Sequence, residues 1–366
     1  MNVVLFCHSA LSDWNHGNVH FLRGIAVELQ SRGHRVTIYE PEDAWSIQNL
    51  LRDHGADALA GVRAAYPSLS AVRYREPLDL ESVLADADLV IVHEWNPHDL
   101  VCRIGAHRRR HRAYTLLFHD THHRSVSDPD AMSAYELGDY DGVLAFGEVI
   151  RERYVAQGWA ARAWTWHEAA DVRVFRPRPD VTPAADLVWI GNWGDDERSE
   201  ELHEFLIDPV AELGLSATVH GVRFPTPALD ALQAAGMSYG DWLPNYRVPD
   251  VFARHRVTVH VPRRPYVRTL PGIPTIRPFE ALACGIPLVS APWSDVEGLF
   301  TPGEDYLVAR DGREMVRQLR RVLADPDLAA RLSAHGRRTI LDRHTCAHRV
   351  DELMTIVDSI ASEVAA

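Results

Sequence analysis

Residues 271–300, PGIPTIRPFEALACGIPLVSAPWSDVEGLF, decide the fold of this chain. Pro278 suits the first turn of a helix, where a missing backbone N–H needs no partner. Apolar residues then recur at helical spacing, namely Phe279, Leu282 and Ala283. Gly285 can end the helix in the left-handed conformation, and the run Leu288–Ser290 predicts a short buried strand after it.

The start of this predicted helix has the features of an anion site. It follows a proline-rich loop, so its unpaired N–H groups and positive dipole end face that loop. Arg277 lies just before the helix and Glu280 in its first turn. A guanidinium can bind phosphate, and a carboxylate can accept bonds from both ribose hydroxyls. The pattern predicts a nucleotide diphosphate site; a capped helix with the two side chains solvated or paired together fits the spacing equally well.

The wider segment resembles a known family. FEALACGIPLVS followed by EGLFTPGEDYLV is similar to the donor-binding half of GT-B glycosyltransferases of family 4. The R-x-FEALACG core and the later HTCAHR, His344 to Arg349, resemble its spore-maturation-protein-like branch. In family 4 the helix carries E-x7-E, whose second glutamate matches Glu280 and whose first falls at Gly272. This departure affects the expected donor-sugar contact and not the nucleotide contact.

The composition is that of a globular protein with two domains. A chain of 366 residues is long for one core, and 46% hydrophobic with 24% charged residues is ordinary for globular proteins. The net charge of -13 argues against a nucleic-acid partner. All 38 basic residues are Arg, so a phosphate site depends on Arg, His or backbone N–H groups.

The cysteines and the first residues predict a cytoplasmic protein. The cysteines stand far apart without a C-x2-C pair, which favours reduced thiols over disulfides or zinc ligands. Met1–Cys7 is too short for the apolar region of a signal peptide, and no apolar run approaches the length of a membrane span.

Strand and helix patterns alternate along both halves, which predicts parallel sheets with helices on both faces. The predicted strands are Val3–Cys7, Val36–Tyr39, Leu89–His93, Thr115–His119, Val143–Phe146, Leu187–Gly191, Ala217–Gly221, Val257–Val261 and Leu288–Ser290. The predicted helices are Val19–Leu29, Leu80–Leu84, Ser199–Leu213, Thr226–Ala235, Val248–His255, Glu314–Leu323 and most of 326–364. No G-x-G-x-x-G follows the first strand, so a dinucleotide oxidoreductase is not supported.

The resemblance implies the α/β GT-B architecture. It consists of two Rossmann-like, doubly wound parallel-sheet domains that face a cleft, with C-terminal helices that cross back to the first domain. We expect residues 1–170, with a C-terminal helix at about 345–366, to form the acceptor-side domain. The Pro-rich segment 171–183 is the expected interdomain linker, and 184–344 the expected nucleotide-sugar donor domain.

Polar loops follow the predicted strands of the first half, at the edge where open parallel sheets bind ligands. In SDWNHGN, Ser12 to Asn18, Gly17 lets the backbone approach a donor and Asn18 can cap the helix. HEWN and HDTHH follow two further strands. The expected acceptor-binding residues are Trp14, Asn15, His16, His93, Glu94 and Asp120.

His119 has two interpretations. It matches the position at which family 4 enzymes place a histidine that faces the donor sugar, so the resemblance implies a catalytic role. A structural histidine at a strand end is the alternative. The cluster His119–His123 could hold a metal if it were helical, but Pro129 follows soon and GT-B transfer needs no metal. We therefore expect neither a metal nor a cofactor.

GNWGDDER, Gly191 to Arg198, opens the second domain. Its glycines allow a tight turn, and Arg198 can reach a phosphate at the next helix start. The neighbouring acids Asp195–Glu197 can instead pair with Arg198. Family 4 uses a basic pair here, which Arg263 or Arg264 can complete. The expected donor-binding residues are Gly17, Gly191, Trp193, Arg198, Arg263, Arg264, Thr275, Ile276, Arg277 and Glu280, and Arg198 and Arg277 are expected to be catalytic together with His119.

These features together resemble a glycosyltransferase that moves a sugar from a nucleotide-sugar donor to a glycan, a small molecule or a lipid-linked acceptor. Retention of configuration is implied by the resemblance alone. One alternative is a GT-B nucleotide-sugar epimerase or hydrolase. Another is a non-catalytic nucleotide-sugar-binding or sporulation-type structural protein, which Gly272 favours. The residues do not specify base, sugar or acceptor, and the oligomeric state stays open, a homo-oligomer included.

Overall fold

The computed structural model describes residues 1–194 and 196–365. By its internal contacts the described chain divides into two compact units. Unit 1 comprises Met1–Glu168 and Cys346–Ala366, and unit 2 comprises Ala169–Thr345. The Pro-rich segment 171–183 begins unit 2, and Phe175 within it is buried in the core of that unit.

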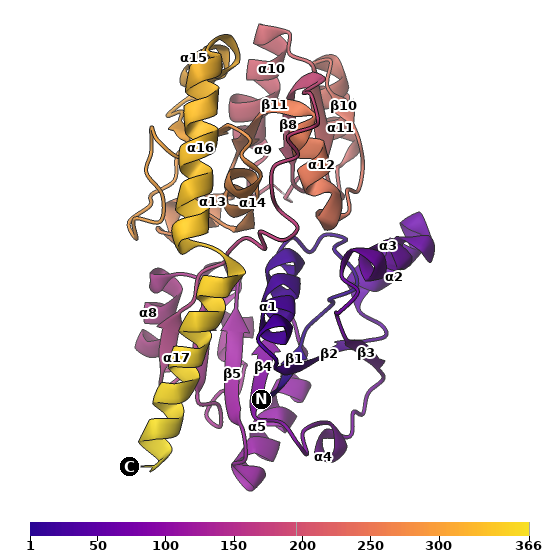
Figure 1. Cartoon of the computed structure of the whole chain (residues 1–366), viewed down its shortest axis with the longest axis vertical. Coiled ribbons are helices and arrows are strands. Elements are labelled where there is room, and N and C mark those ends of the chain that lie inside the picture. The colour runs from indigo at the N-terminus through magenta and orange to yellow at the C-terminus, as the bar shows by residue number, and fades with distance from the viewer. Residues whose placement is uncertain (195, 366) are drawn as a thin grey trace. The chain divides into compact units, whose positions relative to one another are not determined.

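Unit 1 is built on a parallel sheet that has seven strands within the described residues, in the order β3-β2-β1-β4-β5-β6-β7 (Figure 1). The strands are β1 (Asn2–Phe6), β2 (Arg35–Pro41), β3 (Ala71–Tyr74), β4 (Leu89–His93), β5 (Thr115–Asp120), β6 (Gly142–Ala145) and β7 (Ala163–Thr165). β4 is buried along its whole length, because it lies at the centre of the sheet with both faces covered.

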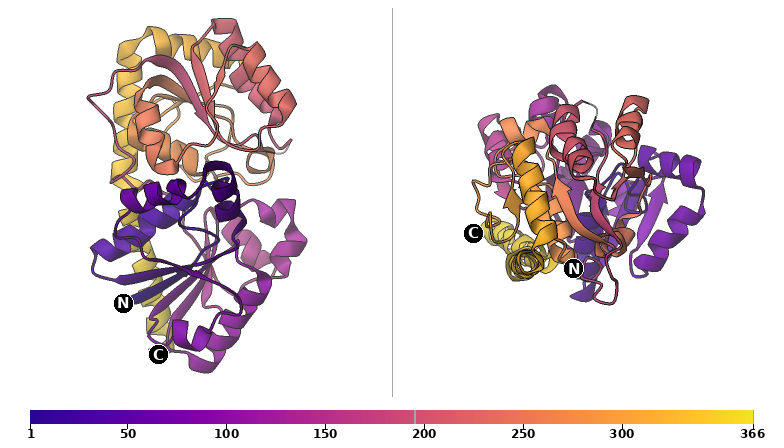
Figure 2. Two further views of the ribbon diagram at one scale, coloured as in Figure 1. Left: turned by 90° about the vertical axis from the view of Figure 1, so that its right-hand side faces the viewer. Right: turned by 90° about the horizontal axis from the view of Figure 1, so that it is seen from above.

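Helices cover both faces of this sheet (Figure 2). They are α1 (Val19–Ser31), α2 (Trp45–His54), α3 (Asp57–Ala65), α4 (Leu80–Val83), α5 (His98–His111), α6 (Arg124–Ser127), α7 (Pro129–Ser133), α8 (Glu148–Ala156) and α17 (Cys346–Ala365). α17 packs beside α1, and Trp166 Nε1 donates a hydrogen bond to the carbonyl of Arg349 at 2.8 Å. The expected return of the C-terminal helix to the first domain is confirmed.

Unit 2 is built on a second parallel sheet, with six strands among the residues described, in the order β10-β9-β8-β11-β12-β13. The strands are β8 (Ala185–Ile190), β9 (Ala217–His220), β10 (Ser238–Tyr239), β11 (His255–His260), β12 (Leu288–Ser290) and β13 (Leu307–Val308). The helices are α9 (Ser199–Leu202), α10 (Asp208–Leu213), α11 (Thr226–Ala234), α12 (Val248–Ala253), α13 (Arg264–Arg268), α14 (Ile276–Cys284), α15 (Gly312–Ala324) and α16 (Pro326–Arg343), with a π-helical turn at His203–Ile207 and a 3-10 turn at Asn245–Arg247.

Side chains of β8 alternate between the two faces of the second sheet, as the pleat of a strand requires. Leu187 and Trp189 lie in the apolar cluster on one face, and Val188 and Ile190 in the cluster on the other. The second cluster includes Phe279 and neighbouring side chains of α14, so this helix is anchored to the sheet by its apolar face. The packing holds the start of α14 at a fixed place beside the strand ends.

Most predicted elements are confirmed, with ends that differ by a few residues. Leu89–His93 and Leu288–Ser290 are strands over the predicted residues, and Gly285 follows α14 in the left-handed conformation with φ of 71°. The strands missed by the sequence pattern are β3, β7, β10 and β13. Each lies at an edge of its sheet and lacks the long apolar run that marks a central strand.

Two local predictions are wrong. Asn18 stands at the start of α1, but its side chain donates to Oε1 of Glu168 rather than capping the helix. Arg277 lies inside the first turn of α14 instead of before it. The chain turns at Thr275, which has φ of 61°, so the helix begins earlier than Pro278 suggested.

Both sheets reverse their strand order beside their first strand, between β1 and β4 in unit 1 and between β8 and β11 in unit 2. Ligands of open parallel sheets bind beyond the carboxyl ends of strands at such a reversal. Two doubly wound, Rossmann-like domains, the predicted fold class, are thus confirmed. No helix in the described part of the chain combines the length and hydropathy needed to span a bilayer.

Candidate functional site

The loops after β8 and β11 fix a guanidinium group at the reversal of unit 2. Arg198 follows the turn at Gly194, which has φ of 93°. Arg198 donates to the carbonyl of Val261 at 2.9 Å and to that of Asn192. Its guanidinium carbon also lies 5.0 Å from the ring centroid of Trp189. The carbonyls come from the loops after both strands, so the charge is held where the two loops meet.

Arg263 and Arg277 bring two further positive charges to Arg198. A Cβ atom built on Gly194 would lie 3.3 Å from Nε of Arg198 and 3.6 Å from Nε of Arg263, so the glycine leaves room for both guanidinium groups. Burial, followed by the charges of Arg263 and Arg277, lowers the pKa of Arg198 to about 9. Arg198 remains protonated at neutral pH, and a bound anion would offset the repulsion among the three groups.

The amino end of α14 adds backbone donors next to Arg277. Thr275 precedes this helix with φ of 61°, an unusual conformation for a β-branched residue, and its hydroxyl makes no capping bond within the described structure. Strained backbone of this kind is often kept at ligand sites. The N–H of Ile276, whose side chain is buried, belongs to the first turn that an anion can bind.

Glu280 is fully buried at the same helix start. Its Oε1 accepts a hydrogen bond from Nδ2 of Asn245 at 3.2 Å, and its Oε2 pairs with Nη1 of Arg277. The pairing of Arg277 with Glu280, which the sequence left as an alternative, is therefore present in this structure. It holds the carboxylate beside the helix start that carries the backbone donors.

Glu297 occupies the space beside Gly272, the position at which the family motif has its first glutamate. Gly272 has φ of 94°, and a Cβ atom built on it would lie 2.5 Å from Oε1 of Glu297. The backbone N–H of Gly272 donates to the carbonyl of Ser294 at 2.7 Å, which holds the two loops together. A carboxyl group from a different loop thus lies next to position 272.

Two residues that were predicted to bind the sugar donor, Trp193 and Arg264, contact other parts of unit 2 in the structure. The indole of Trp193 is buried in the apolar core, 5.7 Å from the ring centroid of Phe224, so we correct the prediction that this side chain binds a donor. Arg264 donates to Oε1 of Glu201 at 2.7 Å and to the carbonyl of Asp196 at 2.7 Å, which ties it to α9.

The loop 191–198 also contains a glycine, Gly191, and a run of acidic residues that the sequence singled out. A Cβ atom on Gly191 would lie 2.8 Å from the Trp189 ring, so only glycine fits there. Glu197 pairs with Nη1 of Arg263 at 2.6 Å, and its charge also acts on Arg198. Asp195 lies outside the described residues.

Unit 1 carries a row of buried histidines at the corresponding edge of its own sheet. Ring centroids are 6.0 Å apart from His8 to His16, 6.1 Å from His16 to His93 and 5.3 Å from His93 to His119. Burial lowers the pKa of His8 to about 4, that of His16 and His119 to about 3, and that of His93 well below its usual value. These rings are therefore neutral at pH 7.

His119 lies at the end of this row. Its ring centroid is 5.8 Å from that of Phe21 on α1 and 4.9 Å from that of Trp166. Neither of its ring nitrogens has a hydrogen-bond partner among the residues described. Leaving a buried polar group unpaired costs about 1–3 kcal/mol, which packing alone does not explain. His119 therefore keeps both interpretations that the sequence gave it.

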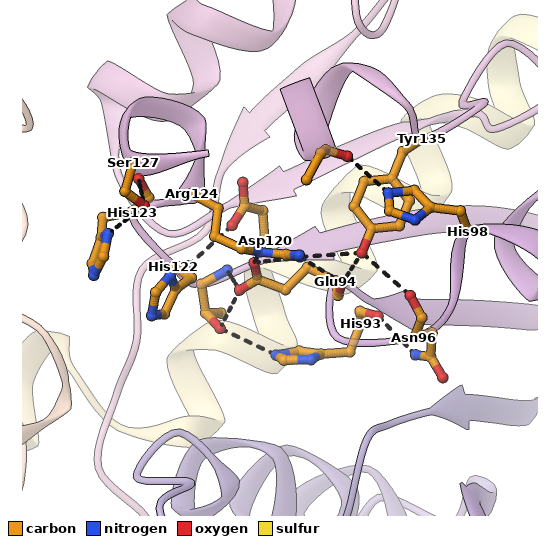
Figure 3. Close-up of polar contacts among 12 residues, drawn as sticks. His93, Glu94, Asn96, His98, Asp120, His122, His123, Arg124, Ser127 and Tyr135 are labelled. Carbon is orange, nitrogen blue, oxygen red and sulfur yellow. Dashed lines mark hydrogen bonds and ion pairs between the residues drawn. The ribbon is translucent and has the colours of Figure 1, made fainter. Parts of the chain in front are cut away.

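Glu94 is the centre of a buried polar network at the ends of β4 and β5 (Figure 3). Its Oε1 accepts from the backbone N–H of Thr121 at 2.8 Å, and its Oε2 from Nη2 of Arg124 at 3.2 Å. Arg124 also donates to the Glu94 carbonyl at 2.7 Å, and Tyr135 donates its hydroxyl to the same carbonyl. Burial, and then the charge of Asp120, raises the pKa of Glu94 well above its usual range.

Asp120 belongs to the same network and is also fully buried. It accepts from the backbone N–H of His122 at 3.0 Å and from the hydroxyl of Tyr154 at 2.9 Å. The sequence predicted that Glu94 and Asp120 contact an acceptor. Their oxygens bond within unit 1 and hold the loop 121–124 in place, so contact of either side chain with an acceptor stays a prediction.

The remaining acceptor predictions, and the donor prediction Gly17, fall on the loop before α1 and on β4. Trp14 and His16 are buried, whereas Asn15, with φ of 51°, and Gly17 are partly exposed. His93 is buried and its Nε2 lies 3.1 Å from Oγ1 of Thr121. Direct contact with a ligand is thus open to Asn15 and Gly17, and the buried side chains position that loop.

Sequence reasoning missed several residues of these sites. Arg124 directly follows HDTHH, and its guanidinium carbon lies 4.4 Å from the ring centroid of Trp95 in HEWN. Since both polar loops follow neighbouring strands, their expected proximity could have pointed to Arg124. Asn245 and Glu297 are far in sequence from the residues they contact. No local pattern marks such pairs.

Comparisons with known proteins agree with this geometry. Residues 198–355 match the protein family described as glycosyl transferase-like. No curated protein sequence matches the chain. Among solved structures, sucrose-phosphate synthase from Thermosynechococcus elongatus has a TM-score of 0.69 at 14% identity, covering 99% of this chain and 100% of that one. Anabaena HepE in complex with UDP has a TM-score of 0.68 at 12% identity, covering 98% and 100%.

A third solved structure is an alpha-glucosyltransferase in complex with UDP and a DNA 13-mer, with a TM-score of 0.70 at 12% identity over 98% of this chain and 100% of that one. At such identities the likeness shows the shared fold. The GT-B fold is therefore confirmed, and the match of residues 198–355 to a glycosyl transferase-like family agrees with the expected enzyme class.

Proposed function

We propose that this protein transfers a sugar from a uridine diphosphate sugar to an acceptor hydroxyl, with retention of configuration and without a metal ion. The observation that carries the proposal is the cluster of Arg198, Arg263 and Arg277 at the start of α14. Three guanidinium groups and a helix amino end match the charge of a diphosphate. Solved structures of the same fold contain UDP or UDP-glucose, which supports uracil as the base.

The proposed step is a displacement at the anomeric carbon. The bond from that carbon to the β-phosphate oxygen breaks, and a bond to the acceptor oxygen forms. The acceptor proton passes to the leaving phosphate, so no protein base is required. Arg198, Arg263 and Arg277 stabilise the charge that grows on the phosphate, which is the role that a metal has in other transferases. This supports independence from metal.

Glu297 is proposed to supply the carboxylate that the family motif would place at position 272. It packs directly on Gly272, and its side chain is partly exposed, so an oxygen is accessible to a sugar hydroxyl. A carboxylate that accepts hydrogen bonds from sugar hydroxyls orients the ring for reaction. The motif is then kept in space although it is interrupted in sequence.

Unit 1 is proposed to handle the acceptor. Trp95 and His122 are partly exposed beside the buried network, with ring centroids 5.1 Å apart, and Arg124 lies over Trp95. Flat aromatic surfaces and a fixed guanidinium suit a polyhydroxylated acceptor such as a glycan. The sequence resemblance to the spore-maturation-protein-like branch and the expected cytoplasmic location remain part of this proposal.

The decisive experiment measures binding and turnover separately. UDP, ADP and GDP are titrated into the full chain by calorimetry, and UDP-sugars are then incubated with and without a panel of glycan acceptors while released UDP is measured. We expect UDP to bind best, and acceptor-dependent UDP release to continue in EDTA. Proton NMR of the glycoside product, compared with the donor, reports retention.

Each alternative has its own result in the same assay. UDP release without acceptor indicates a hydrolase, and a changed sugar on intact UDP indicates an epimerase. UDP binding without turnover of any donor would favour a non-catalytic binding protein. Absence of binding by all three nucleotides, in a chain that is folded by circular dichroism, would overturn the donor site itself.

A further inference from the structure

Two histidines and a glutamate meet at the amino-end edge of the sheet in unit 1. His107 and His111 stand four residues apart on α5, so their rings share one face of the helix. Glu81 lies on α4, the neighbouring helix (Figure 1). α5 ends just before β5 begins and α4 precedes β4, which places this cluster opposite the carboxyl ends of the strands. It is therefore separate from the candidate sites above.

The geometry of the cluster is that of a metal site. Oε2 of Glu81 lies 3.5 Å from Nε2 of His107 and 3.1 Å from Nε2 of His111. The three ligand atoms all lie within 4.8 Å of one another. Donor atoms around a tetrahedral zinc ion are about 3.3–3.5 Å apart, as bond lengths of roughly 2.0–2.2 Å require. The side chains would need little movement to take an ion between them.

The neighbouring groups hold these ligands in suitable orientations. Nδ1 of the buried His107 lies 2.9 Å from the hydroxyl of Tyr114, which can fix the ring with Nε2 directed to Glu81. Nη2 of Arg110 donates to Oε1 of Glu81 at 3.3 Å, and Nε2 of His111 lies 3.3 Å from the same oxygen, whereas Oε2 is near both histidines. The rings of His107 and His111 are stacked, with centroids 4.4 Å apart. Metal ligands are commonly oriented by such second partners.

We propose that Glu81, His107 and His111 bind a zinc ion, with water in the fourth position, as a clamp between α4 and α5. Two imidazoles and one carboxylate are a ligand set that zinc prefers over magnesium or calcium, which take oxygen ligands. α4 is a single turn, so a bound ion adds a strong link to a short element. The clamp is structural and independent of sugar transfer. The ordinary alternative is a surface ion pair among the same side chains.

The test uses the full chain after dialysis against EDTA. Zinc chloride is titrated by calorimetry against wild type, His111→Ala, Glu81→Gln and His98→Ala. His98 is an exposed histidine at the other end of the same helix and is the matched control. Loss of an orienting partner costs about 10–100-fold in metal affinity, so loss of a direct ligand should cost more than about 100-fold. His98→Ala should bind as wild type does.

A second measurement reports on the clamp itself. Zinc at a hundredfold excess over its dissociation constant should raise the melting temperature of wild type by about 5 °C or more, and that of Glu81→Gln hardly at all. Both substituted side chains are exposed, so the variants should fold. Equal zinc affinity in wild type, His111→Ala and Glu81→Gln would overturn the proposal, as would binding of magnesium as tight as that of zinc.

Discussion

The carboxyl ends of the two sheets differ in their electrostatics. In unit 2, Arg198, Arg263 and Arg277 collect positive charge where β8 and β11 end. In unit 1, the corresponding edge carries neutral histidines and a buried pair of carboxyls, among them His119 and Glu94. One fold, used twice in one chain, thus presents a cluster of three guanidinium groups in unit 2, and neutral histidines beside the ion pair of Arg124 and Glu94 in unit 1.

The proposed function accounts for this difference by the ligand that each edge would bind. A diphosphate needs fixed positive charge and backbone donors, which Arg side chains and the start of α14 provide. A neutral, polyhydroxylated acceptor needs aromatic surfaces and fixed hydrogen-bonding groups instead of a cluster of positive charge. The comparison predicts that substitutions in unit 2 change nucleotide affinity, and that substitutions in unit 1 change turnover.

The largest expected effect belongs to His119→Phe. Phenylalanine keeps the packing against Phe21 and Trp166 and removes two unpaired ring nitrogens, so stability should be unchanged or higher. Positioning by one such group is worth about 10²–10⁴-fold, so kcat with a UDP-sugar donor should fall by that factor while UDP affinity stays constant. Steady-state kinetics and calorimetry on one preparation measure both. Wild-type kcat in the variant would make His119 purely structural.

Glu280→Gln should weaken UDP binding with little effect on the fold. A charge-assisted hydrogen bond is worth about 1.5–3 kcal/mol, which corresponds to roughly 10–100-fold in the dissociation constant. Glutamine can still pair with Asn245, which limits the loss of stability. Calorimetric titration with UDP gives the result, and unchanged affinity would remove Glu280 from the nucleotide site.

Acid should destabilise the folded chain partly through the histidine row. The folded-state pKa of His119 is about 3, below the unfolded value of about 6.5. Above pH 6.5 the ring is neutral in both states; as the pH falls, the unfolded chain binds a proton that the folded chain does not, so stability is lost down to about pH 3. His119→Phe should reduce the slope of unfolding free energy against pH by up to about 1.4 kcal/mol per unit between pH 6 and 4.

Urea unfolding at each pH, for both proteins, measures this difference. The other titrating groups of unit 1 are common to wild type and variant, so their contributions cancel. If the free energy of unfolding changed with pH equally in wild type and in His119→Phe, His119 would take up its proton in the folded state as well. This end of the histidine row would then be open to water.

The smallest expected effect compares two adjacent arginines. Arg263→Ala removes a charge next to Arg198 and should weaken UDP binding by about tenfold, near the lower end for a charged hydrogen bond. Arg264→Ala removes a side chain tied to Glu201 on α9, and should change affinity less than about twofold. Equal losses in the two variants would mean that nucleotide binding senses only net charge.

A good part of the fold and some of the site could be predicted from the sequence. The helix at 276–284 and the strand after it were predictable, because proline, glycine and apolar spacing act over a few residues. Glu280 and Arg277 belong to the same stretch and were predicted as site residues with it, and the structure pairs their side chains. The burial of the Trp193 side chain in the core could not be predicted, because a glycine in a turn does not indicate the direction in which the neighbouring side chain packs.

The sequence by itself determined two alternating series of strands and helices, the helix at α14, and the prediction that a phosphate site relies on Arg. Tertiary structure alone placed Glu297 on Gly272, His93 beside His119, and Glu81 beside two histidines of α5. The physical reason is the distance along the chain over which each kind of interaction acts. Helical period, caps and turns depend on neighbours in the chain, whereas these contacts depend on strand order and on how helices pack across a sheet.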